Sequence, residues 1–107
     1  MSEQTKTPAD DANLKVVRVE SRNRYELRNG DEVIGHAELS SMSGHAYATH
    51  TEINPAWGGR GLGGKLVAGM VDDLVAHDQT LTGVCPFVVK WLERNPAQAS
   101  AVAPEGH

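Results

Sequence analysis

The sequence contains a single cysteine, Cys85, and aromatic residues make up only 5% of its 107 residues. A lone cysteine cannot close an internal disulfide, so the fold must depend on a hydrophobic core, as is usual in a reducing compartment. It also cannot build a zinc site from several cysteines, and the five histidines are widely scattered along the chain. We therefore expect a cytoplasmic protein without a metal site.

Basic residues and long apolar runs are also scarce. Ten lysines and arginines stand against 14 aspartates and glutamates, which gives a net charge of −4. Such a surface does not attract polyanions, so nucleic acid is excluded as a general partner. The longest apolar stretch, residues 66–71, is far shorter than the roughly 20 residues that cross a membrane, and residues 1–10 lack the apolar core of a secretion signal. We expect no membrane partner, and a monomer or a weak homodimer.

Both ends of the chain are poor in large apolar side chains. Residues 1–12 contain no valine, leucine, isoleucine or aromatic residue, and residues 97–107 contain Val102 as their only larger aliphatic side chain. Segments of this kind bury too little apolar surface to offset the entropy that is lost on ordering. We predict flexible tails at residues 1–12 and 97–107, around one domain at residues 13–96.

Short alternating segments predict four strands in the first half of the chain. They cover residues 15–19, 24–28, 32–40 and 45–53. The Asn29-Gly30 pair between the second and third segments is typical of a tight hairpin. Strict alternation places Val33 on the same face as Ala37, and Ile34 on the other. These segments favour an antiparallel meander.

The apolar period changes after the fourth strand. Apolar residues from Leu62 to Val75 recur at spacings that predict an amphipathic helix, ending near residues 77–79. Residues 80–85 form a short apolar strand, which a strand–helix–strand connection makes parallel to residues 45–53. Pro86 suits the first turn of a second helix, and Asn95-Pro96 ends it. The sequence therefore predicts an α+β fold with a mostly antiparallel sheet and a strand–glycine loop–helix–strand–helix core.

Five glycines lie among seven residues at the start of the first helix: Gly58, Gly59, Gly61, Gly63 and Gly64. A glycine inside a helix costs about 1 kcal/mol relative to alanine, so this density indicates that a ligand approaches the backbone closely. Helix N-termini offer unpaired N–H groups and partial positive charge, which suit phosphate. We expect the N–H groups of residues 60–65 to bind a phosphate or pyrophosphate. A flexible loop without a ligand is the alternative.

Two common nucleotide motifs overlap the same loop. Residues 59–64 satisfy the dinucleotide pattern G-x-G-x-x-G, but residues 80–85 contain no acidic residue to bind a ribose. Residues 59–65 match the beginning of a P-loop, but Leu66 occupies the position where a serine or threonine must hold Mg²⁺. Neither motif is complete. A protein that binds another kind of phosphate-containing ligand is therefore still an alternative at this point.

The segment Gly58-Gly59-Arg60-Gly61-Leu62-Gly63 resembles the pyrophosphate loop of the GNAT N-acetyltransferases, Gln/Arg-x-x-Gly-x-Gly/Ala, with Gly58 in place of the Gln/Arg. With Thr49-His50-Thr51-Glu52-Ile53 and Cys85-Pro86-Phe87, the chain resembles the short, single-domain members of that superfamily over residues 25–96. The resemblance implies a GNAT-like fold truncated on its C-terminal side, acetyl-CoA or CoA as cofactor, and acetyl transfer to an undefined amine of a protein or small molecule. The alternative is a non-catalytic module that binds or senses acyl-CoA.

The resemblance also implies a cofactor site. In the family, the strand before the glycine loop splays and its backbone pairs with pantetheine, which here implies Ile53 and Asn54. The loop residues that it implies as cofactor-binding are Gly59, Arg60, Gly61, Leu62, Gly63, Gly64 and Lys65.

Three side chains are catalytic candidates. His50 and Glu52 lie two residues apart on one strand, so they share a face, and an imidazole is the kind of side chain that exchanges protons near neutral pH. Their alternative is a solvated surface pair, bonded to His36 or Glu38 across the strand. Cys85 directly precedes Pro86 at a predicted helix start, where the helix dipole favours a thiolate. The resemblance places this thiol near that of CoA, where it either accepts the acetyl group or lines the pocket. A small buried residue is its alternative.

Overall fold

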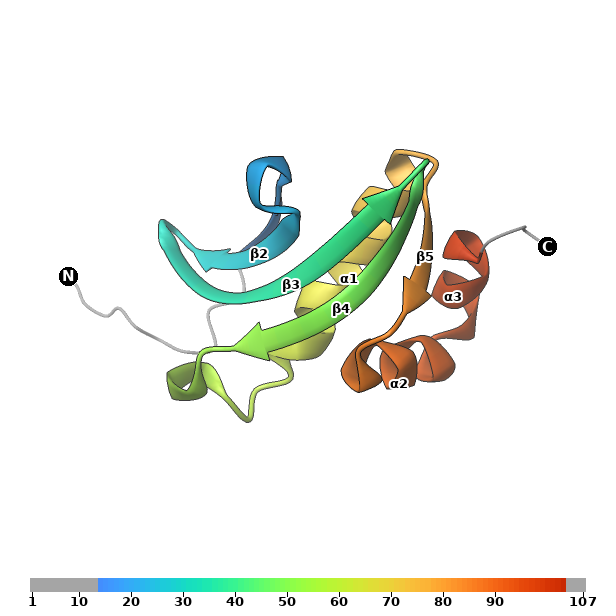
Figure 1. Cartoon of the computed structure of the whole chain (residues 1–107). Helices are drawn as coiled ribbons and strands as arrows, with labels where there is room; N and C mark the ends of the chain where they lie inside the picture. Colours follow the sequence, from blue (N-terminus) through green and yellow to red (C-terminus); the bar gives the residue numbers. More distant parts are fainter. Residues whose placement is uncertain (1–13, 104–107) are drawn as a thin grey trace.

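The computed structural model describes residues 14–103, and the predicted tail at residues 1–12 lies outside them. One sheet of five strands forms the body of the molecule, with its strands in chain order (Figure 1). The first three neighbouring pairs are antiparallel, and the last pair, between the fourth and fifth strands, is parallel. The strands are β1 (Leu14–Val19), β2 (Arg24–Asn29), β3 (Glu32–Met42), β4 (His45–Ile53) and β5 (Thr80–Gly83). The sheet confirms the predicted fold class.

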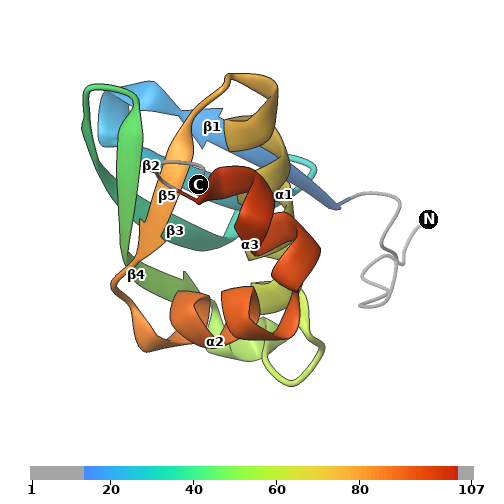
Figure 2. The ribbon, with the colours of Figure 1, turned by 90° about the vertical axis from the view of Figure 1, so that its right-hand side faces the viewer.

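Three helices cover one face of this sheet (Figure 2). They are α1 (Leu62–Ala76), α2 (Pro86–Arg94) and α3 (Pro96–Val102). Two short 3-10 turns, η2 (Glu20–Arg22) and η3 (Pro55–Trp57), follow β1 and β4. No helix within residues 14–103 has the length and apolar character needed to cross a membrane.

The core lies between α1 and the sheet. The apolar stripe of α1 is fully buried at Leu66, Met70 and Leu74, as its spacing predicts. It packs on a sheet face that includes Tyr25 and Leu27. Burying side chains of this size stabilises a fold by about 1.5–3 kcal/mol each, so this layer supplies much of the stability. Within residues 14–103, no α-helix covers the opposite face of the sheet.

The prediction of a flexible tail at residues 97–107 is wrong for the part that the structure describes. Residues up to Val102 form α3, and Val102 is only 1% exposed within the core. Pro96 fits the first turn of the helix, and the following alanines are strong helix formers. Contacts with α1 and α2 then bury Val102. A single aliphatic residue is enough to anchor α3, because the other core side chains surround Val102.

Two β-bulges alter the predicted faces of β3 and β4. Opposite β2, Arg28 pairs with Val33 and Leu27 with Gly35, so Ile34 is an extra residue that turns into the core while Val33 is exposed. Opposite β3, Glu38 pairs with His50 and Leu39 with Ala48, which makes Thr49 an extra residue in β4. A bulge reverses the alternation beyond it. Strict alternation was therefore wrong at these two points.

Candidate functional site

Strands β4 and β5 separate halfway along β4. Their parallel pairing covers only residues 45–48 and 80–83. At its end, the Ala48 carbonyl oxygen accepts hydrogen bonds from the N–H groups of both Val84 and Cys85, each at 2.9 Å. From Thr49 onward, the β4 edge has no neighbouring strand, and the chain after β5 turns into α2. The predicted end of this strand at residue 85 was too late, because the pairing stops at Gly83.

Along the unpaired edge of β4, the exposed backbone groups are those of Thr51 and Ile53. The Asn54 N–H donates to Ile34 O at 2.8 Å, so this position turns its backbone toward β3. In an antiparallel pair the direction alternates, and Thr51 and Ile53 therefore turn their backbone groups away from β3. The Asn54 carbonyl accepts from the Trp57 N–H, and its side chain accepts from the Ala56 N–H. Of the two residues implied for pantetheine, Ile53 has the required orientation and Asn54 does not.

The glycine loop leads into α1 without a capping side chain. Gly59 and Gly61 have φ angles of +76° and +71°, a region that favours glycine, and an added Cβ at either would meet open space. Gly61 is the N-cap residue, and within the described chain no N–H from residue 59 to 64 donates to a backbone carbonyl. The Arg60 guanidinium lies 5.5 Å from the Trp57 ring centre. The loop thus offers a row of donors beside one cation.

Gly63 and Gly64 also have a packing role that the sequence did not predict. A Cβ on Gly63 would lie 2.7 Å from Cζ of Phe87, and one on Gly64 would lie 3.6 Å from Nε1 of Trp91. Both aromatic residues belong to α2, so these two glycines allow α2 to pack on the first turn of α1. Their side-chain positions face the protein, and only their N–H groups remain for a ligand.

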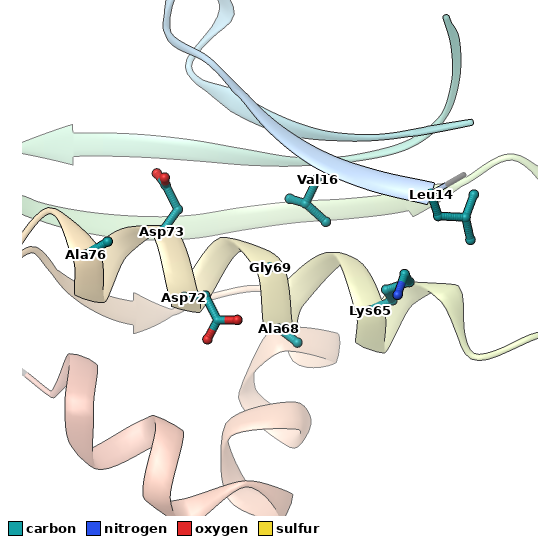
Figure 3. Close-up of a pocket in the computed structure, with 8 residues that line it drawn as sticks. All are labelled: Leu14, Val16, Lys65, Ala68, Gly69, Asp72, Asp73 and Ala76. Atoms are coloured by element: carbon teal, nitrogen blue, oxygen red, sulfur yellow. The ribbon is translucent and has the colours of Figure 1, made fainter. Parts of the chain in front are cut away.

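The side chains of Leu62 and Lys65 point away from the loop backbone in two different directions. Leu62 is buried in the core, so its part is limited to its backbone. The Lys65 side chain lines a surface groove of about 550 Å³ between β1 and α1, together with Leu14, Val16 and Asp72 (Figure 3). Lys65 therefore lies at the end of α1 that carries the loop, on its β1 side.

Cys85 is the N-cap residue of α2 and is 9% exposed. Burial acts to raise the pKa of its thiol, but the nearby Val88 N–H, Thr51 hydroxyl and N–H groups of Phe87 and Thr51 favour the thiolate and together lower that pKa below its usual value. The buried Thr51 hydroxyl has no hydrogen-bond partner among the described residues, so it is available to the thiolate. A thiol with these donors favours its thiolate form, as the predicted helix start implied.

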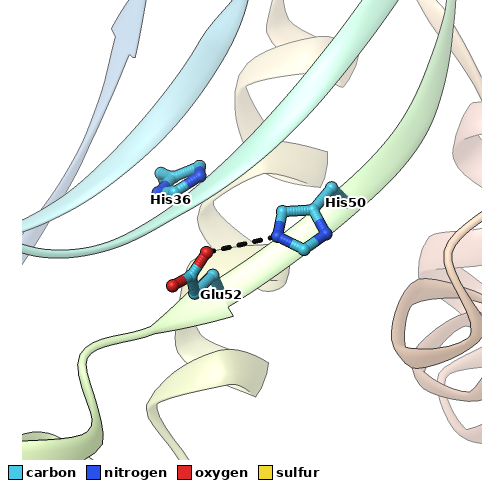
Figure 4. A group of neighbouring side chains, drawn as sticks. All are labelled: His36, His50 and Glu52. Carbon is cyan, nitrogen blue, oxygen red and sulfur yellow. Dashed lines mark hydrogen bonds and ion pairs between the residues drawn. The ribbon is translucent and has the colours of Figure 1, made fainter.

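His50 and Glu52 share a face, as predicted, but it is the open face of the sheet rather than that of Ala46 and Ala48. Nε2 of His50 lies 3.2 Å from Oε1 of Glu52, and both side chains are more than half exposed (Figure 4). Among the described residues no hydrogen bond joins either one to Cys85. Thr51, between them in sequence, turns to the core face and contacts the thiol.

Thr51 is the site residue that sequence reasoning missed. Its hydroxyl and its N–H, on the free β4 edge, both act to lower the pKa of the Cys85 thiol. Its position depends on the extra residue Thr49, which shifts Thr51 from the face predicted opposite Ala48 onto the same face. No local pattern marks a bulge at Thr49. The segment Thr49–Ile53 that carried the resemblance was the one available signal.

Comparisons with known proteins agree on one group. Residues 24–102 match the model of a family described as GCN5-related N-acetyl-transferase. The structure is similar to the solution structure of a GCN5-like N-acetyltransferase from Staphylococcus aureus, with a TM-score of 0.63, 19% identity, and coverage of 86% of this chain and 89% of that one. The ribosomal-protein-S18-alanine N-acetyltransferase from Escherichia coli gives a TM-score of 0.58 and 16% identity, over 73% of this chain and 54% of that one. The curated proteins provide no significant match.

Proposed function

Because the chain belongs to the GCN5-related N-acetyltransferase family and is thus an acyltransferase, we propose that it transfers the acetyl group of acetyl-CoA to an amine. The separation of β4 from β5 is the observation that supports acetyl-CoA as the acetyl donor. We infer that the cleft for acetyl-CoA lies where these strands separate, between the free edge of β4, the Cys85 thiol and the N-terminus of α1. An extended ligand with a phosphate at one end and a thioester at the other matches that order.

Each part of acetyl-CoA has a counterpart along this cleft. The pyrophosphate would accept hydrogen bonds from the N–H groups of residues 59–64, next to the positive end of α1 and Arg60. The amide groups of pantetheine would pair with the backbone of Thr51 and Ile53, as an added strand pairs with a sheet edge. This places the thioester at Cys85, where the cleft ends.

Cys85 is proposed as the first acceptor of the acetyl group. Its thiolate attacks the thioester carbonyl carbon, a new C–S bond to Cys85 forms, and the C–S bond to CoA breaks, so that CoA leaves as a thiolate. The amine then attacks acetyl-Cys85, which forms the C–N bond and returns the thiolate of Cys85. The N–H groups of Thr51, Phe87 and Val88 hold the Cys85 thiolate before and after this cycle.

The proton of the attacking amine needs an acceptor. His50 and Glu52 carry the nearest candidates on β4, with the His50 ring bonded to the Glu52 carboxylate. Such a carboxylate orients an imidazole and stabilises its protonated form. We assign them this role for an amine that reaches the cleft from the open face of the sheet. An acceptor that approaches from there need not pass the helices.

Titration calorimetry with acetyl-CoA, CoA and ATP tests the donor. We expect acetyl-CoA and CoA to bind and ATP to bind much more weakly, because ATP lacks the pantetheine arm that pairs with β4. Equal affinity for ATP would favour a general phosphate binder. Incubation with acetyl-CoA and no amine should then yield a protein heavier by one acetyl group in intact-mass analysis, and none on Cys85→Ala. Acetyl-CoA binding without acetylation of the protein or of any amine would favour a sensing module.

A further inference from the structure

The open face of the sheet carries a square of alternating histidine and glutamate side chains. In the β3–β4 register, His36 lies opposite Glu52 and Glu38 lies opposite His50. Along each strand the histidine also contacts its glutamate, with Nε2–Oε distances of 3.2 Å in both pairs. The two histidine rings lie 6.0 Å apart between their centres. Each histidine therefore has a carboxylate beside it in two directions.

We propose that His36, His50 and Glu52 bind a divalent transition-metal ion, for which Zn²⁺ is the probe. One potential ligand atom from each of the three lies within 4.8 Å of the other two (Figure 4). Around tetrahedral zinc, with bonds of about 2.0–2.1 Å, ligand atoms are about 3.4 Å apart. The His50–Glu52 pair is already at 3.2 Å. Both side chains are more than half exposed and free to rotate, so small movements bring in His36.

The charges around the square favour a cation. The nearest arginines, Arg24 and Arg28, both bind Glu26, which is 4% exposed, at 2.7 and 2.6 Å. Within residues 14–103, Glu38 and Glu52 have ion-pair contacts with histidines alone. While the histidines are neutral, the square itself holds two negative charges, and the two arginines with their one glutamate leave a single positive charge on β2 beside it. A divalent ion would offset both and use the histidine nitrogens as ligands.

There is also space for a fourth ligand. A groove of about 300 Å³ adjoins the square and is lined by His36 and Glu52 with Val33 and Pro55. Two histidines, one carboxylate and an open position form a known zinc donor set. The expectation of no metal site depended on the scatter of the histidines in the sequence. The β3–β4 register brings together two that are 14 positions apart.

This inference goes beyond acetyl transfer and does not depend on it. It shares His50 and Glu52 with the proposed proton acceptor, so a bound metal would occupy the imidazole lone pair that takes the proton. Zinc binding and acetyl-CoA binding are measured separately, and the failure of either leaves the other titration unchanged.

Titration of the metal-free chain with Zn²⁺ by calorimetry tests the site, with Co²⁺ absorption as a report of the ligand geometry. We expect one ion per chain and at least tenfold weaker binding in His36→Gln, since losing even a supporting partner of a ligand costs about 10–100-fold. His77→Gln is the matched control: His77 is exposed and lies 3.5 Å from an Asp73 oxygen, but on a helix, away from the square. We expect it to bind Zn²⁺ as the unmodified chain does.

Two results would overturn the proposal: no saturable Zn²⁺ binding by the unmodified chain, or equal binding by His36→Gln. A loss in His77→Gln alone would also overturn it, because the ion would then bind elsewhere. Circular dichroism confirms that each variant is folded. Should His36→Gln not fold, Glu52→Gln gives the same comparison, because the Glu52 side chain is 60% exposed and makes no core contact.

Discussion

Helices α1 and α2 begin side by side but have different groups at their first N–H groups. At α1 the N-cap residue is Gly61, which has no side chain to accept a hydrogen bond. At α2 the N-cap residue is Cys85, and the Phe87 and Val88 N–H groups favour the thiolate of Cys85 and act to lower its pKa. We call the α1 start open, because no side chain caps it, and the α2 start closed, because the Cys85 thiol occupies it.

The difference shows how one kind of local structure serves two purposes. Unpaired N–H groups at α1 attract an anion from outside the protein. The same groups at α2 stabilise a negative charge on the protein's own thiol, and so lower the pKa of Cys85. Contacts of Phe87 and Trp91 with Gly63 and Gly64 hold the two helix starts together. The comparison predicts that substitutions at the two starts have separable effects.

The largest effect is expected at the closed start. Cys85→Ala should lower kcat/KM for acetyl transfer by more than about a thousandfold, as the loss of a nucleophile does. Its affinity for CoA should change little, because the phosphate donors lie at α1. Steady-state kinetics and calorimetry measure the two quantities. Transfer at the normal rate would show that Cys85 only lines the cleft, and that the amine attacks acetyl-CoA directly.

The packing of the N-terminus of α2 on the N-terminus of α1 should be disturbed by Gly63→Val. The new side chain would overlap Phe87, since a Cβ alone lies 2.7 Å from Cζ. Overpacking of this kind lowers the free energy of unfolding by about 1–3 kcal/mol. Urea denaturation measures the loss, and adding Phe87→Ala should recover part of it. If the double variant is no more stable than Gly63→Val, the contact with Phe87 is not the cause.

The open start is tested by Gly61→Val. We expect the affinity for CoA to fall about tenfold, which corresponds to the loss of one hydrogen bond of about 1.4 kcal/mol. Gly30→Val is the control, because Gly30 also has a positive φ, +60°, and open space around it, but lies in the β2–β3 turn. Calorimetry of both variants separates backbone strain from ligand contact. An equal fall in both would remove the loop from the CoA site.

The smallest effect concerns the pH dependence of Cys85. Hydrogen bonds lower the pKa of its thiol, so in the folded chain the thiolate, and with it alkylation by iodoacetamide, should appear at lower pH than in the urea-unfolded chain. Thr51→Val removes one donor and should shift the folded profile slightly to higher pH. Bound acetyl-CoA should slow the labelling. A profile in Thr51→Val that is identical to the original would show that the hydroxyl does not act on the thiol.

Local chemistry in the sequence was sufficient for most of the fold. The Asn29-Gly30 hairpin and the apolar stripe of α1 are confirmed because both depend on neighbours within a few residues. The positions of Thr51 and Val102 were missed because each depends on distant partners. The predicted place of the glycine loop between a strand and a helix is confirmed, but the packing of Gly63 against Phe87 requires the position of α2. From the sequence it was clear that glycine is needed at residue 63, but not that Phe87 is the neighbour that requires it.

The extra residue at Thr49 has a consequence for how this chain tolerates changes of length. Because Thr49 is the extra residue, deleting it would leave a regular alternation in which Ala48 and Thr51 face α1 while His50 and Glu52 still face outward. The β4 edge would lose the bend that accompanies a bulge, and would continue along β5. A deletion of a single codon at this position would therefore keep the faces of these side chains and remove the bend that separates β4 from β5. Point substitutions at Thr49 leave the number of residues unchanged, so we expect the separation of the two strands to tolerate them better than the deletion.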